Sequence, residues 1–528
     1  MHAVKRFIFC SAAAVLVVMD GAWAADLPVK AKAVEYVRIC SLYGDGFYYI
    51  PGTDTCIKIG GYLRVDLVVN SNADDTGNTT GAGGAQNRFT NAYTWRARIE
   101  PTIDTRTATE YGVVRTFADL PFTWGNDTYA GNGTGATVYS PIGPSPFGSA
   151  PYNASAGVVE GGTMGVYAAF IQFAGFTIGK AISQFSAPWQ NYPGNNFDGL
   201  VGGGGAVTGV NQFTYTGEFG DGVSAAISVQ DQTAYYQAGV ANLGALSPLG
   251  TALGATGPFG SSAYAGTIAP DIVGMVHVNQ AWGQFQASFA AHDNHAAYYG
   301  ATEVTGHPDD KWGWAVQAAL QIKNIPTGVK DTINIQGVYT DGATRYNIQD
   351  LAASAGANVI YGGTSQPGAY QSVGFGVASD TAFAAGTQQQ LTQTWGGRGA
   401  FNHNWDPHWS SALYGAYAAV MYNDTAKTLI CGVGGVGGAI RGALNPVGSG
   451  TAITVCNPDY NIGQLGFITR WTPVKNLTFS GDVTWTHLDQ MSQGTVSAPS
   501  ANIGKPAAVY ELKDQDTVVL LLRAQRNW

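Results

Sequence analysis

Three stretches near the start of the chain, residues 57–69, 93–104 and 110–121, carry basic residues on a face that alternates with an apolar face. In a β-strand, residues two apart point to the same face, so each stretch has one charged face and one apolar face. If the three strands are neighbours, their charged faces form one surface that can attract ions and orient polar solutes. This surface, here called the basic strip, comprises Lys58, Arg64, Arg96, Arg98 and Arg115.

Carboxylates share these faces, which leaves a second interpretation open. Asp66, Glu100 and Asp104 have the parity of the strip and could hold its arginines in structural ion pairs. The two interpretations are compatible, because a paired arginine can still line an aqueous surface. Arg470, on the polar face of a later stretch, residues 461–472, is a further candidate for the same surface.

Motifs for catalysis or metal binding are weak elsewhere in the chain. His292 and His295 are possible metal ligands, but they lie where a predicted strand runs into a loop, and we expect them to be solvated. The Gly-rich run 432–438 resembles a phosphate-binding loop only in composition, because it does not join a strand to a helix. We therefore expect no metal, no cofactor and no catalytic residues, with an enzyme carried by a barrel as the minor alternative.

About sixteen strands of roughly ten residues are predicted to position these side chains. Short connectors, the first expected at residues 105–107, alternate with long segments rich in Gly, Ser, Asn and Thr. This alternation is typical of an antiparallel barrel whose short turns lie at one end. The strands are predicted at residues 57–69, 93–104, 110–121, 165–174, 175–183, 211–219, 222–230, 271–281, 282–292, 312–323, 331–341, 395–405, 410–422, 461–472, 477–487 and 516–528.

Composition indicates a membrane barrel. Charged residues make up 12% of the chain, about half of the ~25% typical of soluble domains. Beyond the amino-terminal segment no stretch reaches the roughly 18 consecutive apolar residues of a spanning helix. The predicted fold is therefore all-β, a transmembrane antiparallel β-barrel with a water-filled lumen and aromatic girdles. A closed sheet can span lipid because every backbone N–H and C=O group forms a hydrogen bond within the sheet. The alternative is a secreted soluble β-protein. The net charge of -9 argues against a nucleic-acid partner.

The start of the chain indicates export. Lys5 and Arg6 precede an apolar run, and residues 22–24 have the small-x-small form of a cleavage site, which predicts a signal peptide at residues 1–24. Residues 25–56 are expected to form a periplasmic tether and disulfide segment, and residues 57–528 the barrel. An exported chain can hold disulfides. Cys40, Cys56, Cys431 and Cys456 allow three connectivities, of which pairing within each local pair is favoured.

Both ends of the chain resemble a known family. Residues 37–64, VRICSLYGDGFYYIPGTDTCIKIGGYLR, residues 460–471, YNIGQLGFITRW, and the closing strand are similar to the alphaproteobacterial general-diffusion porins, while the middle matches mainly by pattern. The resemblance implies an outer-membrane homotrimer whose third long loop, about residues 184–210, folds inward. Asp198 is the acid of that loop. It is expected either to face the basic strip and set a transverse field or to cap a turn.

We therefore expect a channel for passive diffusion of small hydrophilic solutes and ions across the bacterial outer membrane, in contact with lipid and lipopolysaccharide. Two other functions stay open. A channel selective for a substrate such as a sugar or an anion would show saturable binding, and a plugged structural barrel would show no conductance.

Overall fold

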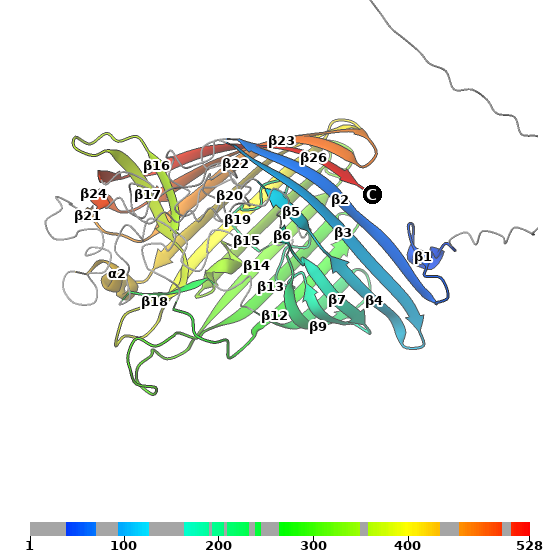
Figure 1. Cartoon of the computed structure of the whole chain (residues 1–528), viewed down its shortest axis with the longest axis horizontal. Helices are drawn as coiled ribbons and strands as arrows, with labels where there is room; N and C mark the ends of the chain where they lie inside the picture. The colour runs from blue at the N-terminus through cyan, green and yellow to red at the C-terminus, as the bar shows by residue number, and fades with distance from the viewer. Residues whose placement is uncertain are drawn as a thin grey trace, which may run out of the picture.

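A closed β-barrel forms the body of the molecule (Figure 1). The computed structural model describes residues 38–69, 93–125, 163–189, 193–204, 208–231, 238–243, 263–348, 357–432, 453–498 and 508–528. The predicted signal peptide and residues 25–37 of the predicted tether lie outside these ranges. Among the described helices, none is both long enough and apolar enough to span a membrane.

Sixteen antiparallel strand positions follow one another around the barrel in the described ranges, as predicted. Strand β26 pairs with β23 on one side and with β2 on the other, where Val69 lies opposite Leu520. The sheet therefore closes without a free edge. The strands are β2 (Thr55–Val69), β3 (Tyr93–Thr109), β4 (Gly112–Asp119) continued by β5 (Phe122–Gly125), β6 (Thr163–Met164) continued by β7 (Ala168–Phe173), β8 (Phe176–Ala181), β9 (Val210–Glu218), β10 (Val223–Gln230), β12 (Asp271–Gln280), β13 (Gly283–Asn294), β14 (Lys311–Lys323), β15 (Thr332–Asp341), β19 (Gln390–Asn404), β20 (Trp409–Tyr422), β22 (Tyr460–Val474), β23 (Leu477–Gln490) and β26 (Gln515–Asn527).

Short turns alternate with long connections, as expected. The turn between β7 and β8 is Ala174–Gly175, with φ of 49° and 84°, and positive φ at both residues fits a two-residue hairpin of type I′. The prediction of a first turn at residues 105–107 was wrong. Strand β3 continues to Thr109, because Arg106 and Thr107 still pair with the first residues of β2.

The two faces of the strands differ as the alternation predicted. On β22, Leu465, Phe467 and Trp471 are exposed on the outer face, whereas Gln464 is buried on the inner face. The outer face of β22 carries no charged side chain, and an arginine there at mid-depth would cost ~2–4 kcal/mol in lipid. Exposed tryptophans of the described strands include Trp95, Trp312, Trp314, Trp395, Trp409, Trp471 and Trp485.

The end of the barrel with long connections carries more regular structure than the sequence indicated. A second sheet has the order β16 (Ala357–Gly362), β17 (Gln371–Val377), β25 (Ala508–Leu512), β24 (Gln493–Ala498) and β21 (Ile453–Val455). It lies near helix α2 (Asp424–Cys431), away from the carboxyl terminus of the chain (Figure 1). A disulfide between Cys431 and Cys456 joins the end of α2 to the residue after β21.

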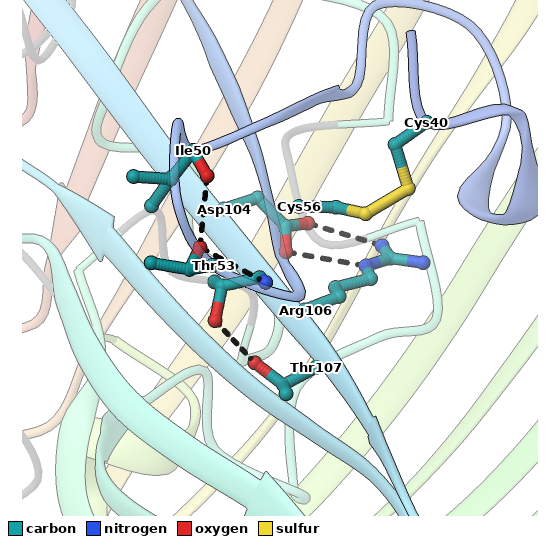
Figure 2. Close-up of a disulfide and its surroundings, with 8 residues drawn as sticks. Cys40, Ile50, Thr53, Cys56, Asp104, Arg106 and Thr107 are labelled. Atoms are coloured by element: carbon teal, nitrogen blue, oxygen red, sulfur yellow. Dashed lines mark hydrogen bonds and ion pairs between the residues drawn. A yellow bond between two sulfur atoms is a disulfide. The ribbon is translucent and has the colours of Figure 1, made fainter. Parts of the chain in front are cut away.

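The segment before the barrel is anchored at the opposite end. It contains a 3-10 turn, η1 (Ser41–Tyr43), and β1 (Tyr48–Tyr49), which pairs with the start of β2. A disulfide joins Cys40 to Cys56, beside the ion pair of Arg106 with Asp104 (Figure 2). The segment is thereby held against β2 and β3 at the short-turn end.

Candidate functional site: the lumen wall and the third loop

The third long connection, between β8 and β9, lies inside the barrel, as predicted. Its backbone binds inward-facing side chains of distant strands. Asn196 N donates to Asp482 Oδ2 at 2.6 Å on β23, Val201 N donates to Gln464 Oε1 at 3.0 Å on β22, and Gly204 N donates to Gln317 Oε1 at 3.0 Å on β14. These bonds to three different strands show that the loop follows the inner wall.

An apolar cluster fixes the tip of this loop. Phe197 is fully buried against Val68 of β2 and Val519 and Leu521 of β26. Burying a phenylalanine is among the larger single contributions that a side chain makes. The inner face of β26 is therefore apolar at this level because it receives the loop.

Glycines allow the returning part of the loop to approach the wall closely. Gly202 has φ of 90°, and a Cβ placed on it would lie 2.3 Å from the carbonyl oxygen of Gly397. A Cβ on Gly203 would lie 1.9 Å from Gln336 Nε2. A larger residue at either position would push the loop away from β15 and β19, which explains the Gly-rich sequence here.

Asp66 is the centre of the basic strip. Its buried carboxylate accepts hydrogen bonds from Arg96 Nη2 at 2.6 Å and from Arg523 Nε at 2.6 Å, and Arg64 Nε lies 3.6 Å away. Three guanidinium groups thus surround one carboxylate. The cluster keeps a positive charge even though its members are paired.

Asp198 belongs to the same network. Its Oδ2 accepts a hydrogen bond from Arg96 Nη1 at 3.0 Å, and its side chain is 30% exposed. Arg96 therefore bridges Asp66 on the wall and Asp198 on the loop. Asp198 contacts the strip directly instead of standing across the lumen from it.

The other members of the strip have separate surroundings. Lys58 Nζ donates to the carbonyl oxygen of Asp45 at 3.1 Å, in the amino-terminal segment. Arg115 Nη2 lies 3.0 Å from Asp104 Oδ2, near the short-turn end. Arg98 Nε donates to Thr123 Oγ1 at 2.8 Å on β5. The strip is one face of the wall, but its members lie in four electrostatic environments, the Asp66 cluster and these three.

Arginines also hold the loop through its carbonyl groups. Arg470 Nη2 donates to Gly194 O at 2.6 Å, and Arg398 Nη1 donates to Leu200 O at 3.1 Å. Arg523 and Arg398 were absent from the sequence-based candidates. Alternation could have indicated Arg398. Residues 518–522 of β26 are apolar on both faces, so the parity of Arg523 carried no signal.

The expectation from the sequence that His292 is solvated was wrong. It is buried, its Nδ1 lies 2.8 Å from Asp271 Oδ1, and its Nε2 lies 2.9 Å from the hydroxyl of Tyr264 and 3.5 Å from Asp380 Oδ2. Asp380 also accepts a hydrogen bond from Thr344 N at 2.6 Å. We call these side chains the histidine cluster. It ties two long connections to the ends of β12 and β13. The sequence did not indicate this role because the partners of His292 are distant from it along the chain.

His295, the other candidate ligand, lies apart from this cluster, with its Nδ1 2.6 Å from Asp310 Oδ1. Within the described ranges, no group of three or more His, Cys, Asp or Glu side chains is arranged to hold a metal ion.

Known proteins share this architecture. A family model described as "Porin subfamily" matches residues 26–521. Porin Omp2b of Brucella suis biovar 1 (strain 1330) is 34% identical over 230 residues, which are 43% of this chain and 54% of that protein. Porin Omp2b of Brucella melitensis biotype 1 is 33% identical over the same shares. The chain spans about half the length of the curated relatives it matches.

A solved structure is similar over nearly the whole chain. The outer membrane channel DcaP of Acinetobacter baumannii superimposes with a TM-score of 0.51 at 12% sequence identity, covering 91% of this chain and 99% of that one. At this identity the likeness concerns the fold.

Proposed function

Because this chain belongs to the porin subfamily whose model spans it, and is an outer-membrane β-barrel, we propose that it forms a water-filled channel for passive diffusion of small hydrophilic solutes and ions. One observation carries the proposal: the third loop lies inside a closed barrel and is fixed to its wall. A loop in this position narrows a lumen and defines what can pass.

Polar and charged groups on the inner wall support passage of hydrophilic solutes. We assign lumen-lining roles to the basic strip, to Arg470 and to Asp198, with Arg96 and Arg470 also holding the loop. Arg98 is half-buried, and so are Tyr62 and Tyr167 near it. Partly exposed polar groups of this kind let a hydrated solute exchange hydrogen bonds with the wall while it passes.

The surroundings of the channel follow from the same proposal. The outer face would contact lipid and lipopolysaccharide, and three copies would assemble into a homotrimer. Residues 1–24 would be removed as a signal peptide. Residues 25–56 would form a periplasmic tether, locked at its end by the disulfide of Cys40 with Cys56. The inward loop and the family favour a channel over catalysis, so we do not propose an enzyme.

Conductance of the refolded full chain in a planar bilayer tests the proposal. We expect ohmic current, insertion events that close in three steps, and permeation by small neutral sugars without saturation. Saturation by one sugar would instead identify a substrate-selective channel. Absence of conductance from a correctly folded barrel would contradict the proposal and indicate a plugged structural barrel.

A further inference from the structure

Two arginines lie directly opposite each other on neighbouring strands of the lumen wall. In the register of β2 with β3, Arg64 pairs with Arg98, whereas Asp66 pairs with Arg96 and Lys58 pairs with Asp104. Residues directly opposite in an antiparallel pair have their Cβ atoms ~4.5–5.5 Å apart, and like charges there are destabilising. The adjacent pairs on this face are Asp66 with Arg96, which is complementary, and Tyr62 with Glu100, so Arg64 and Arg98 form a local excess of positive charge that Glu100 only partly offsets.

Carboxylates on the wall offset only part of this excess. Asp119 of β4 lies within electrostatic range of Arg98, but its side chain is hydrogen-bonded to that of Glu100. No described carboxylate forms an ion pair with Arg98, whose Nε is bound to the neutral hydroxyl of Thr123. Arg64 Nε is buried without a hydrogen-bond partner among the described atoms, and it lies 3.6 Å from Asp66. Both oxygens of Asp66 are already bound by Arg96 and Arg523.

Aromatic rings hold the two guanidinium groups in place. The Cζ of Arg64 lies 5.0 Å from the ring centre of Tyr62, and that of Arg98 lies 5.4 Å from the ring centre of Tyr167. The carboxylate that follows Arg98 on the same face, Glu100, accepts a hydrogen bond from the hydroxyl of Tyr62. Stacking orients a guanidinium without neutralising it. The two donors are thus positioned and still charged.

We propose that Arg64 and Arg98 form a binding site for a small oxoanion, a phosphate or a carboxylate, in the lumen of this channel. The planar guanidinium matches the oxygens of such anions, and a bound anion bridges the two positive charges that otherwise repel. The inference rests on the proposed channel function and adds its ligand class. It makes Arg98, the half-buried member of the pair, the residue that an entering anion contacts.

The test measures chloride current through the full-length channel while inorganic phosphate or acetate is added. In the wild type we expect saturable inhibition by the oxoanion. For Arg98→Gln the concentration for half-inhibition should rise at least about tenfold, equivalent to ~1.4 kcal/mol. Arg98→Lys keeps the charge but loses the planar donor pair, so it should bind more weakly than the wild type and more tightly than Arg98→Gln.

Arg526→Gln is the matched control, because it removes one positive charge from β26 at a residue that pairs with the outward-facing Leu63. Phosphate or acetate should inhibit the chloride current of Arg526→Gln at the same concentration as that of the wild type. A second readout needs no current: phosphate should raise the melting temperature of the wild type and not that of Arg98→Gln. Equal inhibition and equal melting shifts in Arg98→Gln and Arg526→Gln would overturn the site. Absence of any wild-type conductance would instead refute the channel itself.

Discussion

Phe197 is expected to fix the third loop more strongly than the ion pair of Asp198. Phe197 is 0% exposed, and a buried Phe→Ala substitution costs ~3–5 kcal/mol. Asp198 is 30% exposed, so the loss of its bond to Arg96 should cost about 1 kcal/mol or less. Arg96 keeps its bond to Asp66 in Asp198→Asn, so no buried charge is left unpaired.

The difference of at least ~2 kcal/mol predicts distinct behaviour of the two variants, since 1.4 kcal/mol changes an equilibrium tenfold. In Phe197→Ala the loop should leave the wall part of the time, which increases current noise in the open channel and protease cleavage within the loop. Asp198→Asn should resemble the wild type in both assays.

Phe47→Ala provides a matched control, because Phe47 is 4% exposed but lies in the amino-terminal segment. It removes a similar side chain without touching the loop, so its current noise should match the wild type. Circular dichroism verifies that each variant keeps its β-sheet. Our reasoning would be wrong if Asp198→Asn released the loop as readily as Phe197→Ala.

Three further predictions concern the ends of the barrel. His292→Phe leaves two buried carboxylates without their shared partner, so protease cleavage of the long connections should increase while the barrel stays folded; unchanged cleavage would exclude a fastening role. Replacing both Cys431 and Cys456 by Ser should increase protease cleavage near α2 without lowering the melting temperature of the barrel. A lower melting temperature would show instead that the disulfide stabilises the barrel itself. The third prediction is a dependence on pH: burial acts to raise the pKa of Asp331, but hydrogen bonds from Asn404 N and two side chains outweigh it and lower the pKa from 3.8 to about 2. A lowered pKa stabilises the fold at pH values above the pKa of Asp331 in the unfolded chain, and this stabilisation is lost as the pH falls toward 2. The melting temperature of the wild type should therefore fall more between about pH 4 and pH 2 than that of Asp331→Asn. Parallel curves of melting temperature against pH would refute this.

The strand pattern was predictable because it is local. Two-residue periodicity assigns each side chain to a face, and a membrane penalises charge on the outer face. Residues 57–69 and 461–472 could therefore be predicted as strands, with their inner and outer faces, without knowing the neighbouring strands. Turn positions were less certain. The end of β3 was misplaced because the residues that prolong it, Arg106 and Thr107, look like a turn until their partners in β2 are known.

The partners of the charged side chains were decided by the tertiary structure. Arg96 and Asp198 are 102 residues apart, and Arg523 and Asp66 are 457 apart. Whether a carboxylate faces an arginine or binds it depends on the path of the loop, which Phe197 sets by packing on β26. Periodicity gives the face of a side chain and not its partner. The sequence alone therefore determined a barrel with a basic inner wall, and the folded loop determined which of those charges remain available to a solute.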